Sequence, residues 1–486
     1  MSTHTSKPSL ALSLCPVAFL VALLVTNVLL FGDSATSGPN QMALFVAALF
    51  TALLGRFVLR HDYESLENAA IQAITLAMKA NLILLVVGAL IGLWILSGIV
   101  PTLIYYGVLL INPSIFLLVA CVSCSLVSLA IGSSWSTMGT IGVALVGVGE
   151  TLGIPLPMVA GAIVSGAYFG DKLSPLSDTT NLAPAAAGSD LFTHVRHLLY
   201  TTLPAYAIAL CGYAIAGLWF HPDSFDPAFV QEVTTVISAH FNVGVYTLAT
   251  PVFVFGMVML RVPAIPALVA GAFIGALQAL LLQRGLLTEL TGDDMSAGAL
   301  YRLIVTTAHS GMSIETGNEL TDQLFNKGGM LNMLNTVLLI IMALFFGGMM
   351  EATGMLQRLA DAMLSMVRGT ASLVTATLAT CVLFNLTASD QYLAIVVPGR
   401  MFRDAFARMH LKAQNLSRAL EDAGTVTSVL VPWNTCGAFA ASVLAVPTVA
   451  YLPWTFFNLL CPVVAIAMAT MGWGIAYEDK ETAPTE

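Results

Sequence analysis

Residues 170–184 read GDKLSPLSDTTNLAP and lie between two apolar runs, residues 157–169 and 198–220. Two carboxylates, a lysine, several hydroxyls and two prolines are unusual there, because the 486-residue chain is 57% hydrophobic and only 9% charged. Apolar runs of the roughly 20 residues needed to cross a bilayer recur along the whole sequence. The composition therefore predicts an integral membrane protein with an all-α polytopic fold.

The apolar runs predict about ten membrane spans, with several interrupted segments between them. The first run is longer than the roughly 7 to 15 residues of a signal-peptide core, and no convincing cleavage pattern follows it, so we expect it to remain a span. We expect no soluble domain of any size. The predicted spans lie near residues 10–31, 40–59, 80–100, 114–133, 198–220, 241–260, 262–283, 331–350, 370–388 and 451–477.

The two halves of the chain align without gaps at an offset of 256 residues. This offset places Gly348 on Gly92 and Asn434 on Asp178, within stretches of similar character. Transporters are often built from two related halves, so we expect a duplicated unit. The resulting division of the chain is N-terminal spans (1–79), a first repeat (80–220), connecting spans with an acidic segment (221–330), a second repeat (331–477) and a cytoplasmic tail (478–486).

The basic residues predict that the two repeats face opposite sides of the membrane. Residues 400–418 contain four Arg and one Lys, whereas their counterpart, residues 144–162, contains neither. Short cytoplasmic loops carry an excess of Lys and Arg, so the first of these segments is expected inside and the second outside. The repeats are therefore expected to be inverted. From the remaining basic residues we expect both termini in the cytoplasm.

The opening stretch has the composition of a helix that is broken at membrane depth. Pro175 interrupts the backbone hydrogen bonds, and the hydroxyl and amide groups around it can bond the freed backbone or bind a hard cation. The corresponding stretch in the second repeat, VPWNTCGAF at residues 431–439, has the same character. Two matched interruptions predict a transporter's binding site. The alternative is an ordinary polar loop between two spans.

Residues from 170 onward, GDKLSPLSDTTNLAPAAAGSDLFTHVRHLLYTTLP, resemble the signature segment of the NhaC-type sodium/proton antiporters. Three further stretches are similar to this family, and the likeness runs nearly the full length: TGNELTDQLFNKGGMLNMLNT, NLTASDQYLAIVVPGRMF and EDAGTVTSVLVPWNTCGAF. The family belongs to the ion transporter superfamily, so the resemblance implies inverted repeats, broken helices, re-entrant hairpins and alternating access. Some relatives exchange organic acids such as malate and lactate together with sodium and protons.

Carboxylates in the broken segments are the candidate ion-binding groups. A buried carboxylate can hold a proton or a hard cation but resists standing charged and unpaired, so competition for one site couples the two ions. Each candidate could instead belong to a structural polar network, and Asp171 could pair with the adjacent Lys172. The predicted cation and proton site comprises Asp178, Asp390, Asp171, Thr179, Asn181, Ser134, Asn434, Thr435 and Glu351, with Na⁺ held at Asp178, Asp390 and Asn434.

The leading hypothesis is a secondary active transporter that exchanges Na⁺ for H⁺, with Li⁺ left open as a further substrate. The alternative is a sodium-coupled antiporter of small carboxylates, which the lack of a buried Arg in the broken segments slightly disfavours. An intramembrane hydrolase would need a nucleophile with its base or a metal set, and the sequence has neither HExxH nor GxSxG. We therefore expect no enzyme activity, no cofactor and no metal cluster.

Two further features bear on partners. No basic cluster suggests nucleic acid, so the expected surroundings are the lipid bilayer, and whether the chain forms a homodimer stays open. Glu315, Glu319 and Asp322 are spaced to share one helical face. This acidic group is typical of a solvated surface helix, with a vestibule for incoming cations as the alternative.

Overall fold

The computed structural model describes residues 7–31, 35, 38–110, 112–219, 227–260, 262–292 and 294–478. These residues form helices joined by short loops, and the β contact among them is an isolated bridge between Leu411 and Tyr477. Eight of the described helices are long and apolar enough to cross a bilayer, or up to 11 spans if each of three bent helix pairs counts as one. The chain is therefore a multi-pass helical membrane protein. The predicted tail lies outside the described residues from 479 onward.

The helices form two series, joined by the connecting helices α12 (Pro227–His240) and α13 (Ala249–Met259). The first series is α1 (Leu10–Phe31), α2 (Pro39–Leu53), α3 (Tyr63–Leu76), α4 (Met78–Leu96), α5 (Ile99–Leu110), α6 (Pro113–Ile131), α7 (Ser134–Thr137), α8 (Val143–Thr151), α9 (Leu156–Leu173), α10 (Asp178–Ala187) and α11 (Leu191–Trp219). The second series is α14 (Ala264–Leu282), α15 (Arg284–Thr291), α16 (Ala297–Ser310), α17 (Glu319–Phe325), α18 (Leu334–Ala352), α19 (Met355–Ser365), α20 (Thr370–Thr387), α21 (Gln391–Arg408), α22 (Ala413–Ala419), α23 (Thr435–Leu444), α24 (Thr448–Tyr451) and α25 (Phe456–Met471).

Helix boundaries in the two series follow the 256-residue offset. Helix α4 begins at Met78 and α18 at Leu334, and their last residues are the same distance apart. At this offset the unbroken α21 corresponds to residues 135–152, a stretch in which α7 and α8 are joined by a π-helical segment. The correspondence begins earlier than residue 80, because α14 starts 254 residues after α1 and α16 starts 258 residues after α2.

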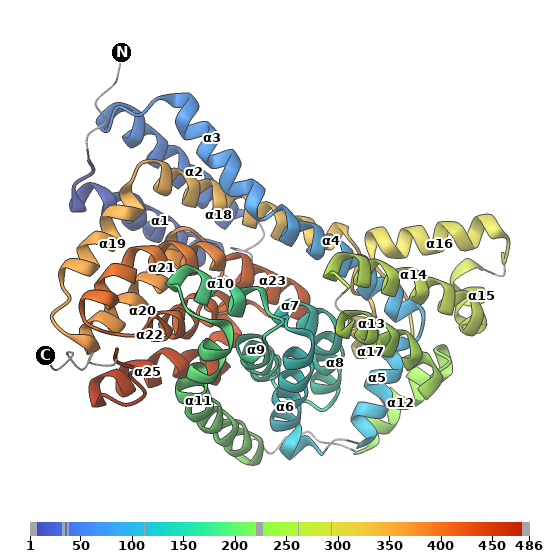
Figure 1. The fold of residues 1–486 in the computed structure, drawn as a ribbon. Coiled ribbons are helices and arrows are strands. Elements are labelled where there is room, and N and C mark those ends of the chain that lie inside the picture. Colours follow the sequence, from blue (N-terminus) through green and yellow to red (C-terminus); the bar gives the residue numbers. More distant parts are fainter. Residues whose placement is uncertain are drawn as a thin grey trace, which may run out of the picture.

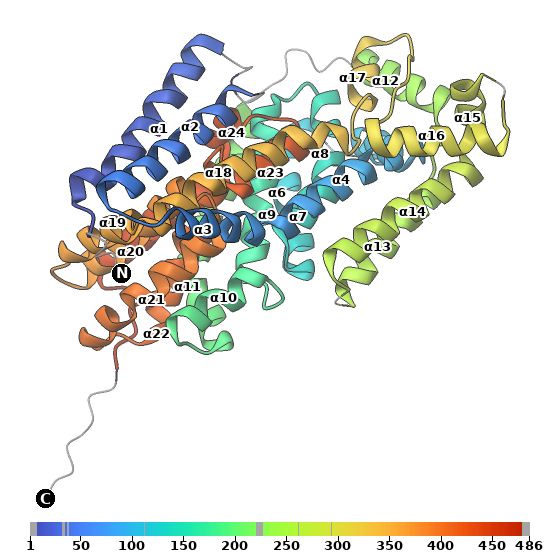
Figure 2. The ribbon, with the colours of Figure 1, turned by 90° about the horizontal axis from the view of Figure 1, so that it is seen from above.

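Leading helices of each series pack against the other series. Helix α2 lies along α18, and α16 lies against α4 (Figures 1 and 2). Phe45 on α2 contacts Phe345 on α18 with ring centroids 6.0 Å apart, and the Gln41 side-chain amide donates to Asn335 Oδ1 at 2.9 Å. The two halves are therefore interlocked.

Helices α6 and α9 are the most closely packed pair in the centre of the molecule (Figure 1). Gly170 makes this approach possible, because a Cβ at this position would lie only 2.6 Å from the Cβ of Ser128 on α6. Small residues let membrane helices approach closely. This contact fixes the last turn of α9, where the opening stretch begins.

Two of the bent helix pairs involve predicted spans: one bend lies at the start of the predicted span 241–260, and the other lies inside the predicted span 451–477. Residues 231–240 and 245–257 meet at 77°, and residues 448–454 and 456–471 meet at 58°. At the first bend the Gln283 side chain accepts from the Asn242 backbone N–H at 2.8 Å and donates to its carbonyl at 2.9 Å. At the second, Pro447 and Pro453 lack the backbone N–H that a continuous helix needs. A hydropathy profile records neither the Gln283 hydrogen bonds nor the missing proline N–H groups, so it predicts neither bend.

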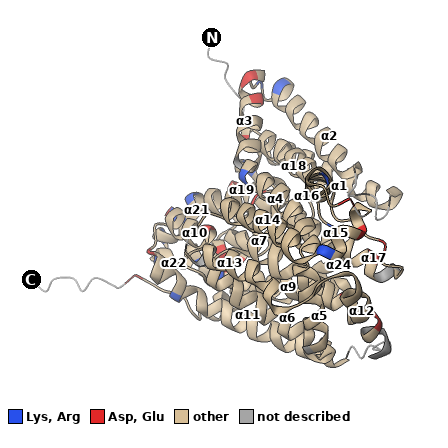
Figure 3. Ribbon diagram, turned by 90° about the vertical axis from the view of Figure 1, so that its right-hand side faces the viewer, with Lys and Arg blue, Asp and Glu red and all other residues tan. Residues whose placement is uncertain are grey.

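Charged residues are sparse, and most of the coloured positions in Figure 3 lie near helix ends. This distribution suits helices whose middles face lipid or other helices. The charged side chains that are buried among the described residues are Asp171, Lys172, Asp390, Arg418, Glu421 and Asp422.

Candidate functional site

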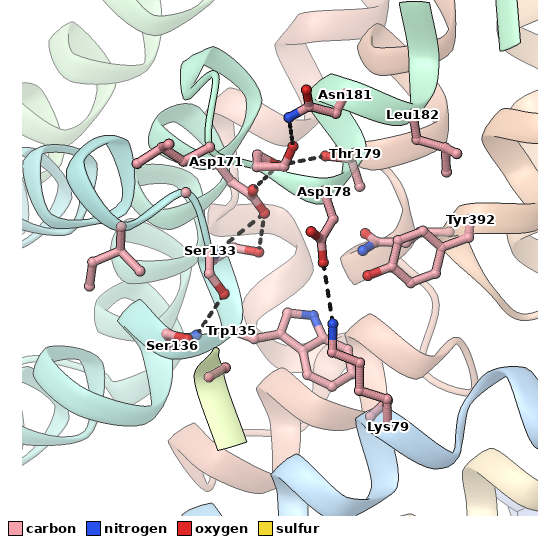
Figure 4. A pocket seen from close by; sticks show the side chains of 18 of the residues that line it. Lys79, Ser133, Trp135, Ser136, Asp171, Asp178, Thr179, Asn181, Leu182 and Tyr392 are labelled. Carbon is pink, nitrogen blue, oxygen red and sulfur yellow. Dashed lines mark hydrogen bonds and ion pairs between the residues drawn. The ribbon is translucent and has the colours of Figure 1, made fainter. Parts of the chain in front are cut away.

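A cavity of about 1030 Å³ lies where the first break meets the second series. Its walls come from the start of α4, the α6–α7 junction, the α9–α10 break, and the N-termini of α21 and α23 (Figure 4). The sequence-predicted site residues that line it are Ser134, Asp171, Asp178, Thr179, Asn181, Asp390 and Thr435.

The break between α9 and α10 is held by polar side chains from the opening stretch. Helix α9 ends two residues before Pro175, and its free carbonyls need partners. The Thr180 hydroxyl donates to the carbonyls of Asp171 and Lys172, both at 3.1 Å. The Asn181 amide donates to the carbonyls of Pro175 and Ser177 at 2.9 and 2.7 Å. Hydroxyl and amide groups of this stretch thus stabilise the interruption, as expected where no water satisfies the backbone.

Of the three acids that line the cavity, Asp171 accepts the most hydrogen bonds from protein groups. Its Oδ2 accepts from the Ser134 hydroxyl at 2.6 Å and from the Ser134 backbone N–H at 3.2 Å. Its Oδ1 accepts from the Ser177 hydroxyl at 2.5 Å. The residue is only 5% exposed. A carboxylate with three donors retains its charge at a buried position more easily than an unpaired one.

Asp178 lies in a different environment at the same cavity. Its carboxylate is 3.7 Å from the Lys79 ammonium, and both side chains are about two-thirds exposed, at 67% and 66%. Figure 4 shows this pair facing each other across the cavity. Exposed ion pairs of this kind contribute little stability, so the pair can open when another ion arrives.

Asp390 caps the first turn of α21. Its Oδ1 accepts from the backbone N–H groups of Tyr392 and Leu393 at 2.9 and 3.1 Å, and the residue is 4% exposed. The break that precedes α23 is joined to this turn, because the Thr435 N–H donates to the Ser389 carbonyl at 3.0 Å. The second series therefore contributes Asp390 and Thr435 to the cavity, together with Gln391 and Tyr392.

Asp178 and Asp390 lie at helix N-termini, and Asp171, in the last turn of α9, contacts the start of α7. Asp171 bonds the first residue of α7, Asp178 is the first residue of α10, and Asp390 precedes α21. Helix N-termini carry partial positive charge, which stabilises carboxylates there. Within the described part of the chain, no three His, Cys, Asp or Glu side chains are close enough to hold one metal ion together. A cation in this cavity would therefore meet at most two of these side chains, with neutral oxygens as its other ligands.

Two predicted site residues lie away from the cavity lining. Asn434 is fully buried and caps α23: its Oδ1 accepts from the Cys436 N–H at 3.0 Å, and its amide donates to the Asn385 carbonyl at 3.1 Å. Glu351 lies at the end of α18. The expected Na⁺ ligands Asp178, Asp390 and Asn434 are therefore not all cavity residues, and the first two differ sharply in exposure.

Several lining residues were not identified from the sequence: Lys79, Ser133, Trp135, Gln391 and Tyr392. Trp135 stacks on Phe439 with ring centroids 4.1 Å apart, which joins α7 to α23 across the cavity. Ser133 and Gln391 flank predicted residues, so an extended window would have found them. In the sequence, Lys79 stands out only as a basic residue near the start of a predicted span, which does not indicate a cavity residue.

The acidic segment serves a local structural role at Asp322. Its carboxylate accepts from the backbone N–H and the hydroxyl of Thr316, both at 2.7 Å. These hydrogen bonds hold the pKa of Asp322 below its usual value. The side chain of Glu319 lies outside the described residues. The vestibule interpretation gains no support from this geometry.

Comparison with known proteins identifies the family. Residues 166–473 match the model of the Na⁺/H⁺ antiporter family. The chain is 38% identical to a malate-2H⁺/Na⁺-lactate antiporter of Bacillus subtilis, covering 92% of each chain, and 36% identical to the Na⁺/H⁺ antiporter NhaC of Alkalihalophilus pseudofirmus, covering 98% of each. Among solved structures, the YdaH transporter of Alcanivorax borkumensis is 14% identical, with a TM-score of 0.29 over 95% of this chain and 98% of that one. This chain belongs to the Na⁺/H⁺ antiporter family, which confirms the resemblance seen in its sequence.

Proposed function

We propose that the protein exchanges Na⁺ for H⁺ across the bacterial cytoplasmic membrane, with the cavity as the site of alternating access. The observation that carries this proposal is the buried Asp171 carboxylate, which lines the cavity beside the hydroxyls of Ser134 and Ser177. Family membership supports the same activity. One carboxylate with several neutral oxygens is a ligand set that a hard monovalent cation accepts.

Exchange follows from competition at this carboxylate. Na⁺ requires the ionised form of Asp171, with the hydroxyl oxygens of Ser134 and Ser177 turned toward the ion. A proton neutralises the same oxygen and leaves nothing for the cation. Asp178 would attract cations toward the cavity, where its exposed pairing with Lys79 can be displaced.

Reconstitution in liposomes tests the activity. With a pH dye inside, Na⁺ added outside should drive a pH change, and Asp171→Asn should abolish it, because the amide neither binds a proton at this pH nor balances the cation. Asp361→Asn on the exposed face of α19 is the matched control and should transport normally. Normal exchange by Asp171→Asn would remove this carboxylate from the mechanism.

A second candidate, sodium-coupled exchange of a small carboxylate, is favoured by Lys79. Its ammonium faces the cavity, whose volume lies in the range of small-molecule sites. A Bacillus subtilis relative is a malate-2H⁺/Na⁺-lactate antiporter. Malate and lactate gradients applied to the same liposomes test this candidate. Lys79→Met should then abolish the response to the carboxylate gradients while leaving the response to Na⁺. If the wild-type protein responds to neither malate nor lactate, carboxylate exchange is excluded.

The membrane orientation is part of the proposal. Inverted repeats with both termini in the cytoplasm are supported by the basic side chains of residues 400–418, in α21, α22 and the loop between them, and by the matching helix boundaries. Labelling from each side of the membrane, described in the Discussion, tests it.

A further inference from the structure

A second group of ionisable residues is buried behind the cavity. The Lys172 ammonium pairs with Asp422 Oδ1, and neither side chain is exposed to solvent. Lys172 also contacts the Cys461 sulfur at 2.8 Å, and the Thr201 hydroxyl donates to Asp422 Oδ1 at 2.8 Å. Lys172 directly follows Asp171 on α9, so this group and the cavity carboxylate are joined through adjacent residues.

Glu421 is the unexplained member of this group. It lies in a π-helical segment, residues 420–425, and its side chain is fully buried with no hydrogen-bond partner on either carboxyl oxygen. The ionisable groups that act on it from neighbouring elements are Asp171 and Lys172 of α9, Cys381 of α20 and Asp422. An ionised carboxylate without hydrogen bonds is strongly disfavoured at such a position. Burial without a hydrogen bond therefore favours the neutral form of this carboxyl group over the ionised one.

A count of charges explains why a neutral Glu421 is stable here. Lys172 and Arg418 contribute two positive charges, with Arg418 Nε 3.9 Å from Asp422 Oδ2. Asp422 contributes one negative charge, so one further negative charge balances the group. Asp171 supplies it when ionised, and Glu421 could supply it instead.

We propose that Glu421 is a proton-carrying site, distinct from the cation site in the cavity, that loses its proton when Na⁺ neutralises Asp171. The inference rests on the proposed Na⁺/H⁺ exchange but places the exchanged proton on Glu421 instead of Asp171, which stays ionised and binds Na⁺. Na⁺ binding to the Asp171 carboxylate leaves Lys172 and Arg418 with an unbalanced positive charge. Ionisation of Glu421 restores the balance, and its proton passes to water. One positive charge enters and one leaves, so the charge of the buried region stays constant.

The test separates cation binding from proton coupling. Glu421→Gln keeps the size of the side chain but has no exchangeable proton, so Na⁺-driven proton flux should fall by about tenfold or more, the usual range of a coupling between two sites. Exchange of radioactive Na⁺ for unlabelled Na⁺ needs no proton and should persist, but at a higher half-saturating Na⁺ concentration than in wild type, because the variant cannot supply the negative charge that balances bound Na⁺. Glu150→Gln, at a carboxylate paired with Lys327, is the matched control and should change neither flux.

The outcomes distinguish this inference from the proposed function. If wild-type liposomes show no Na⁺-driven pH change, the proposed function fails. If wild type is active and Glu421→Gln retains proton flux, or loses Na⁺/Na⁺ exchange as well at saturating Na⁺ while still folded, the separate proton site is refuted. Glu421→Met is the second variant, because a position that holds a neutral carboxyl also accepts an apolar side chain of similar size. Failure of both variants to fold would refute the neutral-carboxyl assignment.

Discussion

The two breaks occupy corresponding places in the chain, yet their acids have opposite surroundings. In the first break, Asp178 is two-thirds exposed beside the cavity. In the second, Asn434 occupies the corresponding position and is fully buried as a helix cap, while Asp422 lies upstream in a solvent-free ion pair with Lys172. The two corresponding positions therefore carry different chemistry, an exposed carboxylate at Asp178 and a buried amide cap at Asn434.

The difference shows which charges can take part in exchange directly. An acid that meets the cavity can trade its partner for an incoming ion at small cost. An acid in a buried pair cannot, since removal of its partner leaves an uncompensated charge in a medium of low dielectric constant. The variants below compare the two environments, starting with the largest expected effect.

Loss of the buried lysine should destabilise the fold most. Lys172→Met leaves Asp422 without its partner and should cost about 3–5 kcal/mol of stability. The measurement is the temperature at which the detergent-solubilised protein loses its monodisperse peak in size-exclusion chromatography. Lys79→Met removes a lysine from an exposed pair and should cost less than about 1 kcal/mol. Equal losses in the two variants would contradict the contrast between the breaks, whereas recovery in a Lys172→Met/Asp422→Leu double variant would support it.

A charge placed in the buried cap should have the next largest effect. Asn434→Asp keeps the cap on Cys436 but replaces the amide that donates to the Asn385 carbonyl with an oxygen. Two acceptors then face each other, which should cost about 1–3 kcal/mol. The reciprocal change, Asp178→Asn, should leave thermal stability unchanged because that side chain is exposed. A fully stable Asn434→Asp protein would indicate that this position is reached by water or ions.

A single hydroxyl in the cavity should have a smaller effect, on affinity alone. Ser134→Ala removes the 2.6 Å hydrogen bond to Asp171. A hydrogen bond to a charged group contributes about 1.5–3 kcal/mol, so the apparent Na⁺ affinity should weaken by about tenfold or more. The readout is the Na⁺ concentration that gives half-maximal proton flux. Ser136→Ala, at another serine of the cavity wall, is the control. An unchanged half-maximal concentration for Ser134→Ala would exclude this hydroxyl from the cation site.

Cysteine labelling should leave transport unchanged and report only orientation. Pro157→Cys lies at the start of α9 and Arg408→Cys at the end of α21, in a background where the exposed Cys15 and Cys211 are serines. An impermeant thiol reagent outside whole cells should modify the first and not the second. Modification of both from the same side would contradict inverted repeats.

Much of the fold could be predicted because its signals are local. Runs of apolar residues indicate spans without knowledge of their neighbours, and the combination of Pro175 with clustered hydroxyls indicates the first break. The bend near residue 242 could not be predicted, since Gln283 holds it from a distant helix. The pairing of Lys172 with Asp422 crosses 250 residues of sequence, and nothing local to Lys172 selects this partner over Asp171.

The site was predicted in part for the same reason. Residue types around Asp171, Asp178 and Asp390 indicate ion chemistry, and the structure brings all three to one cavity. Their exposure could not be predicted, because it depends on which helices cover each break. The direction in which the Asn434 side chain points could not be predicted either, because a helix cap and a cation ligand use the same side-chain oxygen. The roles of these residues in transport stay predictions.

The packing of α2 along α18 constrains the order in which the protein is assembled during synthesis. Almost 300 residues separate Gln41 from Asn335, its partner on α18, so the ribosome completes most of the chain before this contact can form. Until then α2 must persist in the bilayer with its eventual contact face against lipid, a state that the alanines on that face tolerate. A truncated first half would insert but lack its scaffold partner, and the second half would lack a partner for α18. Two half-chains synthesised together could complete each other, which makes the protein a candidate for assembly from separately encoded pieces.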